Sequence, residues 1–521
     1  MIRVSRMLFI RVFGTLFVIS LISLTVPAFS EPFNGYTLFS PNNSRTTYLV
    51  DMNNIVVHSW AHNRSGGYSA YLLADGSLLR PAISSSSQLN GGGAMGILQK
   101  LDYNGTLLWE FTYSSATYRA HHDIEPMSNG NVLMIAWELK TAAQAVQAGL
   151  RRSAAIWPDH IIEVQQTGAT SGEIVWQWHA WDHLIQDYNA SRDNYGVIAQ
   201  HPELLDINTG SGGIGPAGGD WMHINAISYN PELDQIVISS HNLNELYVID
   251  HSTTTAEAAT HTGGRWGRGG DYLYRWGNPA NYDAPGARVF DVVHCSWWVP
   301  VGLPGAGHIL AYNNRQSAGA SVIVELIPPY DSLGNYVLVP GTAYGPSTPY
   351  WSYSAAGFFS NHLGGCQRLP NGNTFIAEST SGYLFEVDSL GSVQWSYNRG
   401  GEIPRALRYP LDYPPLQYLS IEQANGALPQ KLELLQNYPN PFNSATTISL
   451  RLPADGIVKL GIYNTLGGRV ATLAAHKLPV GYHTFIWNGT NEQGASVNSG
   501  VYFSTVNAGG KTETLRMILI K

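Results

Sequence analysis

The stretch "LPNGNTFIAESTSGYLFEVDSLGSVQWSY", Leu369 to Tyr397, contains the two patterns that decide the fold. Its first half is an Asn-Gly turn between apolar and β-branched residues, and Asn-Gly tolerates the positive φ angles that tight hairpins need. Its second half is a strand with an acidic residue, a turn, and a further strand that ends in tryptophan. The whole stretch therefore predicts a unit of about four antiparallel strands.

Both halves of this stretch recur along the chain. The tryptophan-ending unit occurs at 48–60, 99–111, 161–178, 246–276, 324–339 with Trp351 downstream, and 385–397. The hairpin occurs between these units, at 73–79, 127–136, 230–239, 303–312 and 369–378. Four-stranded sheets repeated at intervals of roughly 40 to 80 residues are typical of a β-propeller, so the six units predict six blades. Because no hairpin precedes the first unit, we expect residues 35–60 to share a blade with strands from 403–420.

The composition favours an all-β protein. The 521 residues are 44% hydrophobic and 11% aromatic and include 54 glycines, which suits a large core and many turns. A net charge of −8 with 13% charged residues leaves no basic surface for nucleic acid. We predict an all-β, six-bladed propeller over residues 31–420, a linker over 421–434, and a small immunoglobulin-like β-sandwich over 435–521.

Residues 1–30 have the features of an export signal. Arg3, Arg6 and Arg11 precede the apolar run "LFVISLISLTVPAFS", and small residues at Ala28 and Ser30 suit cleavage before Glu31. The alternative is that this run anchors the chain as a membrane helix. We expect a signal peptide and export.

The last part of the chain alternates in "TTISLRL", "VKLGIYN", "HTFIWNG" and "GVYFSTV", which predicts a seven-stranded sandwich. This part closely resembles the C-terminal sorting domain of the type IX secretion system through "NYPNPFN", "VKLGIYNTLGGRV", "GYHTFIWNGTNEQGASVNSGVYF" and "RMILIK". The resemblance implies a bacterium with an outer membrane, interaction with the type IX secretion machinery, and delivery to the cell surface or the medium. The alternative is a generic carbohydrate-binding sandwich.

Several common catalytic motifs are absent from the sequence. There is no G-x-x-x-x-G-K-[ST] phosphate loop, HExxH zinc helix or G-x-S-x-G elbow. The two cysteines, Cys295 and Cys366, give neither a disulfide scaffold nor a four-thiolate zinc site, and either pair once or stay as buried thiols. We predict no cofactor.

Histidines stand at similar distances before several hairpin turns. His223 precedes Pro231 by eight residues and His362 precedes Pro370 by the same eight, while His121 and His122 precede Ser128 by seven and six. His294 opens the hairpin of the remaining blade. Because the first strand of each propeller blade lines the central channel, we expect these imidazoles to converge at one mouth. The alternative for each histidine alone is an ordinary core or rim residue.

From residue 35 to about 400 the chain resembles bacterial aryl-sulfate sulfotransferases. The motifs that carry the resemblance are "HHDIEPMSNGNVL", "WHAWDHLIQD", "HPELLDIN", "DWMHINAISYNPELDQIVISSHNLNELYVIDHSTTTAEA", "LYRWGNP", "ILAYNN" and "QRLPNGNTFIAES". The resemblance implies a six-bladed propeller that moves a sulfuryl group from a phenolic sulfate donor to a phenolic acceptor, without a nucleotide. It also implies a histidine nucleophile that is transiently sulfated, helped by other channel histidines and an arginine.

Carried over by position, the resemblance assigns roles to four residues. The histidine after Asp-Trp corresponds to His223, the histidine opening the next inner hairpin to His294, and the arginine after "NN" to Arg315. The family's nucleophile follows this arginine, which makes His362 our candidate. The sequence departs from the family pattern at Cys295 and Ser296 beside His294 and in the short loop before Arg315. Further residues are predicted to bind substrate: His121, His122, Trp221, Asn225, Trp297 and Asn314. For Trp221 and Trp297 the alternative is ordinary packing within the blades.

The chemistry of these residue types suits sulfuryl transfer. A neutral imidazole is nucleophilic near pH 7, so the transfer can proceed by two displacements in a ping-pong sequence. Arg315 can hold the sulfuryl oxygens, and His223 or His294 can move a proton on and off the phenol. Two other functions stay open: a non-catalytic propeller that binds glycans or peptides, and a sulfatase-like hydrolase.

The segment from Leu139 to Val197 departs from the repeat. It contains the Ala-rich, helix-favouring piece "KTAAQAVQAGLRR" and the aromatic run "WQWHAWDHLIQDYN", and we expect it to form a lid on one face of the propeller. His179 and His183, spaced four apart around Asp182, suit a metal site but equally a structured aromatic lid. We predict no metal site from this spacing.

Overall fold

The computed structural model describes residues 31–85, 88–210, 219–416, 431–437, 440–443 and 445–520. The predicted signal peptide, 1–30, and most of the predicted linker, 421–434, lie outside these described residues. No helix within the described ranges is long and apolar enough to cross a membrane.

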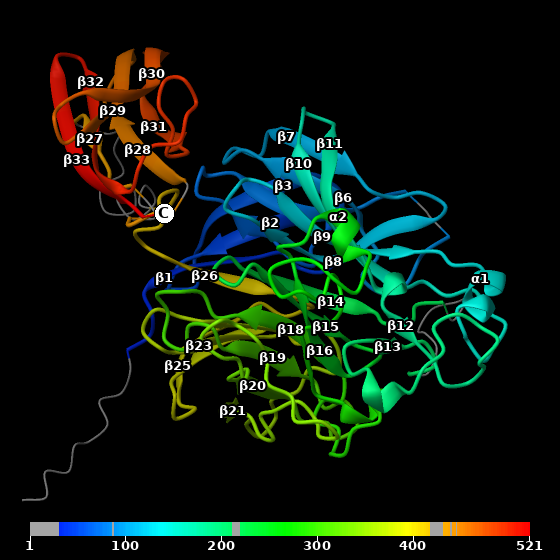
Figure 1. The fold of residues 1–521 in the computed structure, drawn as a ribbon. Coiled ribbons are helices and arrows are strands. Elements are labelled where there is room, and N and C mark those ends of the chain that lie inside the picture. The colour runs from blue at the N-terminus through cyan, green and yellow to red at the C-terminus, as the bar shows by residue number, and fades with distance from the viewer. Residues whose placement is uncertain are drawn as a thin grey trace, which may run out of the picture.

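Most of the chain folds into a β-propeller of six blades, as the repeats predict (Figure 1). The third to sixth blades are separate four-stranded antiparallel sheets, whose strands run in chain order from the inner to the outer edge. Their strands are β8 (Tyr118–Pro126), β9 (Val132–Glu138), β10 (Asp159–Gln166) and β11 (Gly172–His179); β14 (Ile224–Asn230), β15 (Gln235–Ser240), β16 (Glu245–Asp250) and β17 (Tyr274–Trp276); β18 (Val293–Trp298), β19 (Ile309–Asn313), β20 (Val322–Leu326) and β21 (Trp351–Tyr353); β22 (Gly365–Arg368), β23 (Thr374–Glu378), β24 (Tyr383–Val387) and β25 (Val393–Asn398).

The first two blades are joined at one residue pair, Gly66 and Ala82, into an eight-stranded sheet. The second blade consists of β4 (Tyr71–Leu72), β5 (Leu78–Ile83), β6 (Gly96–Leu101) and β7 (Leu107–Thr112). The first consists of β26 (Ala406–Pro410), β1 (Gly35–Phe39), β2 (Ser44–Val50) and β3 (Val56–Gly66). Because β26 comes from the far end of the propeller sequence and pairs with β1, the predicted closure of the ring is confirmed.

Each tryptophan-ending unit supplies the outer strand of one blade. The closing tryptophans lie in β3, β7, β11, β17, β21 and β25. The hairpin turns also have the predicted geometry, and Gly372 of the "NGN" turn adopts a φ of +88° that an L-residue rarely adopts. The two sequence patterns therefore correspond to the outer and inner halves of each blade.

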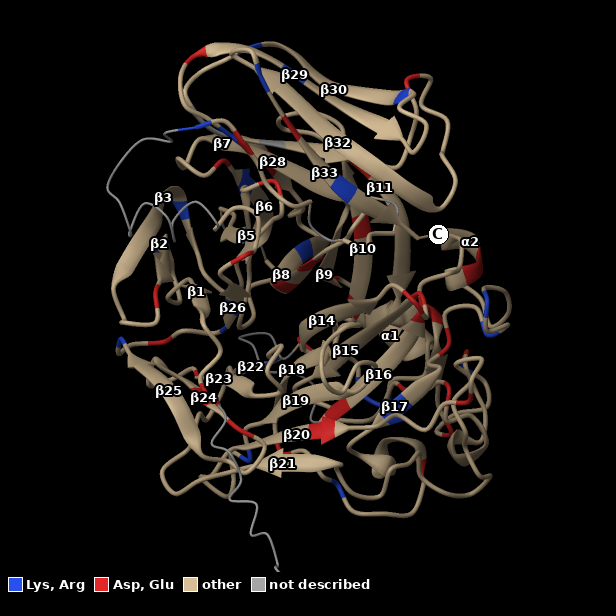
Figure 2. Cartoon of the chain, turned by 90° about the vertical axis from the view of Figure 1, so that its left-hand side faces the viewer, with Lys and Arg blue, Asp and Glu red and all other residues tan. Residues whose placement is uncertain are grey.

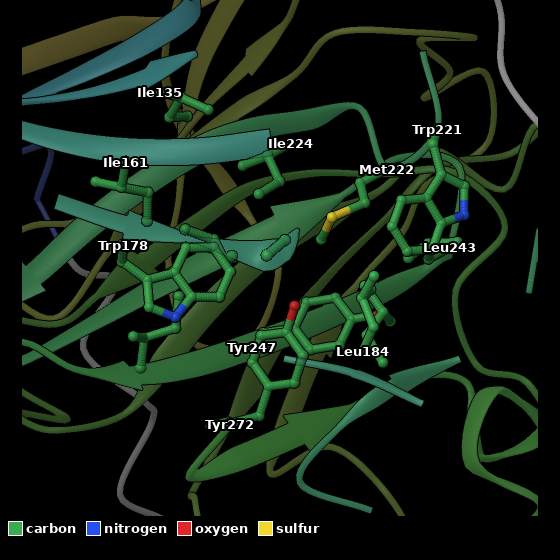
Figure 3. Close-up of a cluster of buried hydrophobic side chains, with 14 of the residues drawn as sticks. Ile135, Ile161, Trp178, Leu184, Trp221, Met222, Ile224, Leu243, Tyr247 and Tyr272 are labelled. Carbon is green, nitrogen blue, oxygen red and sulfur yellow. The ribbon is translucent and has the colours of Figure 1, made fainter. Parts of the chain in front are cut away.

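Apolar side chains from neighbouring blades form the cores between them, and Figure 3 shows the core between the third and fourth blades. Ile135 and Ile161 of the third blade pack there with Ile224 and Tyr247 of the fourth. Trp178 is fully buried in this core, and its Nε1–H donates to the carbonyl oxygen of Gly270 at 2.7 Å. Burying one such large side chain stabilises the fold by roughly 1.5–3 kcal/mol, so this core helps to hold the third and fourth blades together.

Polar side chains reinforce the closure of the ring. Arg408 of β26 is buried, and its guanidinium donates to Thr37 Oγ1 at 2.8 Å and to the carbonyl oxygen of Phe33 at 2.9 Å. The same group lies 3.3 Å from Glu386 and 4.1 Å from the ring centroid of Trp395. The last strand is thus tied to both the first and the sixth blade.

Charged residues do not gather on one face. In the view of Figure 2, Lys and Arg alternate with Asp and Glu along the blades and the C-terminal domain.

The insertion after β9 contains the predicted helix, α1 (Ala142–Gln147), whose N-terminus has a capping box between Thr141 and Gln144. The expected aromatic run is divided, because its first part completes β11 and only its second part leaves the blade. The short elements that follow are η1 (Ala180–Asp182), β12 (Leu184–Ile185), η2 (Ile198–Gln200) and β13 (Leu205–Asp206). Two further short helices, α2 (Thr255–Ala258) and η3 (Pro279–Tyr282), flank β17.

The C-terminal domain is the predicted sandwich and forms a separate body beside the blades (Figure 1). Its described strands form one three-stranded and one four-stranded sheet, in agreement with the seven strands expected. The strands are β27 (Glu433–Leu434), β28 (Thr446–Leu452) and β31 (Gly481–Trp487), and β30 (Arg469–Leu478), β29 (Gly456–Asn464), β32 (Gly500–Ala508) and β33 (Lys511–Leu519).

Candidate active site

The inner strands of four blades share an unusual backbone feature. His122, His223, Cys295 and Leu363, at or just before β8, β14, β18 and β22, all have positive φ angles, between 50° and 61°. Non-glycine residues rarely adopt this conformation, which costs roughly 1–3 kcal/mol each. Because this costly conformation recurs in four blades, the surrounding structure must maintain it, and such conformations are typical of functional sites.

The predicted histidines lie at these bends. His122 and His223 are themselves the residues with positive φ, and His294 and His362 immediately precede one. In β8 the pairing with β9 is interrupted between Ala120 and Ile124, so the intervening residues leave the regular ladder. The bends therefore present imidazoles from four blades.

Five of the imidazoles form a continuous arc. The ring centroids of His121 and His122 are 5.1 Å apart, and His122 lies 4.5 Å from His223. His241, at the end of β15, continues the arc at 4.9 Å from His223 and 5.5 Å from His294. His241 was not among the residues predicted from the sequence.

His223 forms a dyad with a carboxylate. Its Nδ1–H donates to Oδ2 of Asp220 at 2.5 Å, while Oδ1 of Asp220 accepts a hydrogen bond from Trp137 Nε1 at 3.0 Å. Asp220 is fully buried and only 8% of the His223 side chain is exposed. This arrangement fixes the tautomer of His223 and leaves Nε2 to exchange a proton with a ligand.

A second carboxylate reaches the arc through two imidazoles. Nε2 of His121 lies 2.7 Å from Oδ1 of Asp159, and Nδ1 of His121 lies 2.8 Å from Nδ1 of His122. Burial and the charge of Asp220 raise the pKa of Asp159 well above its usual value. Burial lowers the pKa of His121 well below its usual value, so burial favours the uncharged form of both members of this pair.

His294 and Asn314 both bind the loop that carries His362. Nδ1–H of His294 donates to Oδ1 of Asn314 at 2.7 Å, and Nε2 accepts from the backbone N–H of Leu363 at 3.2 Å. The amide of Asn314 donates to the carbonyl oxygens of Ser360 at 2.8 Å and Leu363 at 2.7 Å. Both ring nitrogens of His294 are thus engaged, and these two residues position the loop.

His362 is the accessible member of the group. Its side chain is 44% exposed, and Nε2 lies 3.2 Å from Oε1 of Glu402. Nδ1 lies 2.5 Å from Oδ1 of Asn361. His362 also acts electrostatically on the arc, since its charge contributes to lowering the pKa of both His241 and His294.

Burial keeps the interior of the arc uncharged. Burial first, and then the charge of His223, lowers the pKa of His241 to about 4. The same two causes lower the pKa of His122 well below its usual value, and burial with the charge of His241 does so for His294. At neutral pH these imidazoles are neutral donors and acceptors rather than cations.

A glycine-rich loop, Asn90–Met95, packs directly on the arc. The backbone N–H of His122 donates to the carbonyl oxygen of Gly93 at 2.7 Å. A Cβ atom on Gly93, which has a φ of +71°, would lie 2.2 Å from Nε2 of His122. Buried Arg119 holds this loop by donating to the carbonyl oxygens of Leu89 at 3.1 Å and Met95 at 3.3 Å.

The other predicted site residues have different surroundings. Asn225 is buried and donates to the carbonyl oxygen of Val293 at 2.7 Å, which links two inner strands. Trp221 lies in the core between the third and fourth blades (Figure 3). Trp297 packs in part against the core between the fifth and sixth blades. Arg315 is exposed at the turn after β19, and its charge contributes to lowering the pKa of Asp291.

His241 could have been found from the hairpin register. Ile224 pairs with Ser240 across β14 and β15, so the next residue on each strand end faces its counterpart. The backbone N–H of His241 indeed donates to the carbonyl oxygen of His223 at 3.1 Å. The sequence contains no comparable signal for Asp159 and Glu402, because their partners, His121 and His362, lie far away in the sequence.

The two cysteines are free thiols on neighbouring inner strands. Their Sγ atoms are 3.8 Å apart and both residues are buried. A hydrogen bond from Cys366 lowers the pKa of Cys295, and burial raises that of Cys366. The sequence left open whether the two cysteines form a disulfide or stay as buried thiols, and in the structure they are two buried thiols.

Comparisons with solved structures give matches of low similarity. A protein of unknown function from Bacteroides caccae is 13% identical, with a TM-score of 0.42 over 72% of this chain and 98% of its own. PorZ, a surface component of the type-IX secretion system of Porphyromonas gingivalis, is 12% identical, with a TM-score of 0.26 over 92% of this chain and 64% of its own. FlgD from P. aeruginosa is 21% identical, with a TM-score of 0.14 over 18% of this chain and 74% of its own.

Family models describe both domains. The FlgD Ig-like domain model matches residues 440–511, in agreement with the immunoglobulin-like sandwich. A search of curated proteins finds no match. The arylsulfotransferase (ASST) model matches residues 83–403, which is more than half of the chain and includes every histidine of the arc. The chain therefore belongs to the arylsulfotransferase family.

Proposed function

We propose that this protein transfers a sulfuryl group from a phenolic sulfate ester to a phenolic acceptor through a sulfohistidine intermediate. The observation that carries the proposal is the arc of imidazoles, which joins an Asp220–His223 dyad to the loop bearing His362. Membership of a family of sulfuryl-transfer enzymes and the link between His223 and the buried carboxylate of Asp220 support the same chemistry.

In the first displacement, a ring nitrogen of His362 attacks the sulfur atom of the donor. The nitrogen–sulfur bond forms as the bond between sulfur and the phenolic oxygen breaks, and His223 gives a proton to the departing phenolate. Asp220 supports this step because its carboxylate stabilises the imidazolium form of His223.

In the second displacement, a phenolic acceptor takes the place of the released phenol. His223 removes the acceptor's proton, the acceptor oxygen attacks sulfur, and the nitrogen–sulfur bond breaks to restore His362. One residue thus serves as acid and then as base, and the proton balance closes after each cycle without a cofactor.

Accessibility supports His362 as the nucleophile. A donor sulfate must reach the attacking nitrogen, and the His362 side chain is 44% exposed whereas that of His223 is 8% exposed. Glu402 beside Nε2 can orient the ring and stabilise the positive charge that develops on it. His294 and Asn314 hold the backbone on which His362 stands.

Stabilisation of the sulfuryl oxygens is assigned to neutral N–H donors and to Arg315. Each such donor can contribute a few kcal/mol where negative charge develops. His241 lies between His223 and His294, so its ring can face the transferred group. Arg315 directly follows Asn314, and its exposed guanidinium is the cation that we assign to the sulfuryl oxygens.

The test is an acceptor-dependence assay with 4-nitrophenyl sulfate and the purified protein. Nitrophenol release that requires an added phenol supports transfer. Release at the same rate without phenol would indicate a hydrolase, and no release would favour a binding protein. His362→Asn is expected to lower turnover by about 10²-fold or more, as loss of a covalent nucleophile should. Full turnover in this variant would contradict the assignment.

We further propose that the C-terminal sandwich is a type IX sorting domain and that the protein is exported to the cell surface or the medium. The motifs "NYPNPFN" and "GVYF" and the independent sandwich fold support this proposal. Expression in a host with a type IX system should place the full chain outside the outer membrane. A chain ending at residue 434 should accumulate in the periplasm, and equal export of both chains would contradict the proposal.

A further inference from the structure

A second cluster of metal-ligating side chains lies outside the channel. His183, His261 and Asp271 each offer a ligand atom, and these atoms all lie within 4.8 Å of one another. His183 follows η1 in the insertion, whereas His261 and Asp271 stand in the loop between α2 and β17 of the fourth blade. The pairing of His179 with His183 does not form, because His179 instead lies 3.1 Å from Glu138.

The hydrogen bonds of His183 place the lone pair of Nδ1 against a carboxylate oxygen. Nε2 lies 2.9 Å from the carbonyl oxygen of Ala258, so Nε2 carries a proton and donates it there. In the neutral ring the lone pair is then on Nδ1, which lies 2.8 Å from Oδ1 of Asp271. Two acceptors at this distance require a proton or a metal ion between them.

The same carboxylate oxygen faces a second imidazole. Nδ1 of His261 lies 2.7 Å from Oδ1 of Asp271. One carboxylate can neutralise only one imidazolium, whereas a divalent cation is stabilised by two neutral imidazoles and a carboxylate together. The bond from Nε2 of His183 to a backbone carbonyl is the outer-shell contact that metal-ligating histidines usually make.

Packing fixes two of the three ligands and leaves the third adjustable. His183 is fully buried and parallel to the ring of Trp178, and a Cβ atom on Gly270 would lie 2.5 Å from its Nε2. Asp271 is 5% exposed. The side chain of His261 is 60% exposed, so its ring can rotate outward to open the site to metal dimensions.

We propose that His183, His261 and Asp271 bind a Zn²⁺ ion. Zinc commonly takes three such nitrogen and oxygen ligands and keeps a fourth position for water or a ligand. Two of the three ligands, His261 and Asp271, line a pocket of about 550 Å³ together with His201, Glu203, Leu204 and Arg268. The ion ties the insertion to the fourth blade and is separate from the proposed sulfuryl transfer.

The experiment is a calorimetric titration of Zn²⁺ into the full-length protein after treatment with a chelator. We expect one stoichiometric site, and an increase in the unfolding temperature on its occupation. His261→Gln is expected to weaken Zn²⁺ affinity by more than the roughly 10- to 100-fold typical of outer-shell changes, and to abolish the temperature increase. Because His261 is exposed, this variant should keep the fold.

Three further variants locate the ion. Asp271→Asn should lose the site, while His476→Gln, a change at an exposed histidine of the sandwich, should retain it. His223→Asn should also retain it, which separates this cluster from the channel histidines. Absence of stoichiometric binding, unchanged affinity in His261→Gln, or loss of binding in His223→Asn would each overturn the proposal.

Discussion

Asp220 holds His223 with one carboxylate oxygen, at 2.5 Å, and Trp137 with the other, at 3.0 Å. The indole bond fixes the plane of the carboxylate, and the carboxylate fixes the tautomer of the imidazole. An acid–base residue therefore stands at a defined orientation inside a propeller channel. Both displacements of the proposed mechanism require a proton transfer at the phenolic oxygen, and His223 in this orientation can provide it.

Asp220→Asn should lower kcat by about 10²- to 10⁴-fold, since the amide cannot stabilise the imidazolium of His223. The loss should be larger for donors whose phenol is less acidic, because these leaving groups need the proton more. Rates measured with a series of substituted phenyl sulfates check this. Asp187→Asn, at an exposed carboxylate of the insertion, is the control and should leave the series unchanged. A loss that is the same for all donors would contradict proton transfer by His223.

Gly93→Ala should remove activity without unfolding the protein. The added Cβ would lie 2.2 Å from Nε2 of His122 and must displace that imidazole, and misplacement of about 1 Å in such a site can cost about 10²-fold in rate. Gly456→Ala in the sandwich is the control, because its nearest contact would be 3.8 Å away at the carbonyl oxygen of Ala454, and it should retain activity within a few-fold. Turnover and the unfolding temperature of both variants are to be measured. Equal activity of the two variants would show that catalysis does not require the His122 imidazole at its observed position.

His251 should stabilise the fold in a pH-dependent way. It lies 2.9 Å from Glu163 of the third blade and 2.7 Å from Asp234 of the fourth, and although burial opposes its charge, these bonds raise its pKa to about 9. A pKa raised on folding gives stability that is complete below the unfolded value, about 6.5, and is lost as the pH rises through about 9.

His251→Gln should therefore cost about 2–3 kcal/mol in the free energy of unfolding at pH 6, and less than about 1 kcal/mol at pH 10. Denaturant unfolding at both pH values measures this difference. His476→Gln in the sandwich serves as the control and should show no such pH dependence. A cost for His251→Gln that grows with pH would contradict the assigned sign.

The blade architecture could be predicted from the sequence because its signals are local. Each Asn-Gly or Asp-Gly turn and each closing tryptophan marks a hairpin within a few residues, and the absence of a first hairpin pointed to closure by β26. The sandwich strands were equally visible from their alternation.

The active-site partners were less predictable because they depend on contacts between distant segments. Asp159 meets His121 across two strands, and Glu402 meets His362 through the segment before β26. Trp221 was expected beside substrate, but its Nε1–H donates to the carbonyl oxygen of Thr209 at 3.0 Å, within the core between blades. The positive φ of His223, which sets where each neighbouring side chain points, cannot be read from an isolated strand pattern.

In the proposed mechanism a channel histidine carries the sulfuryl group between donor and acceptor. This sulfated intermediate can be detected by mixing the full chain with 4-nitrophenyl sulfate in the absence of a phenol and measuring the intact mass, followed by peptide mapping. We predict a burst of one nitrophenol per chain, a mass increase of one sulfuryl group, and its location on His362, with no adduct in His362→Asn and a retained adduct in Gln394→Ala. An unmodified protein during phenol-dependent turnover, or an adduct unaffected by His362→Asn, would contradict the account.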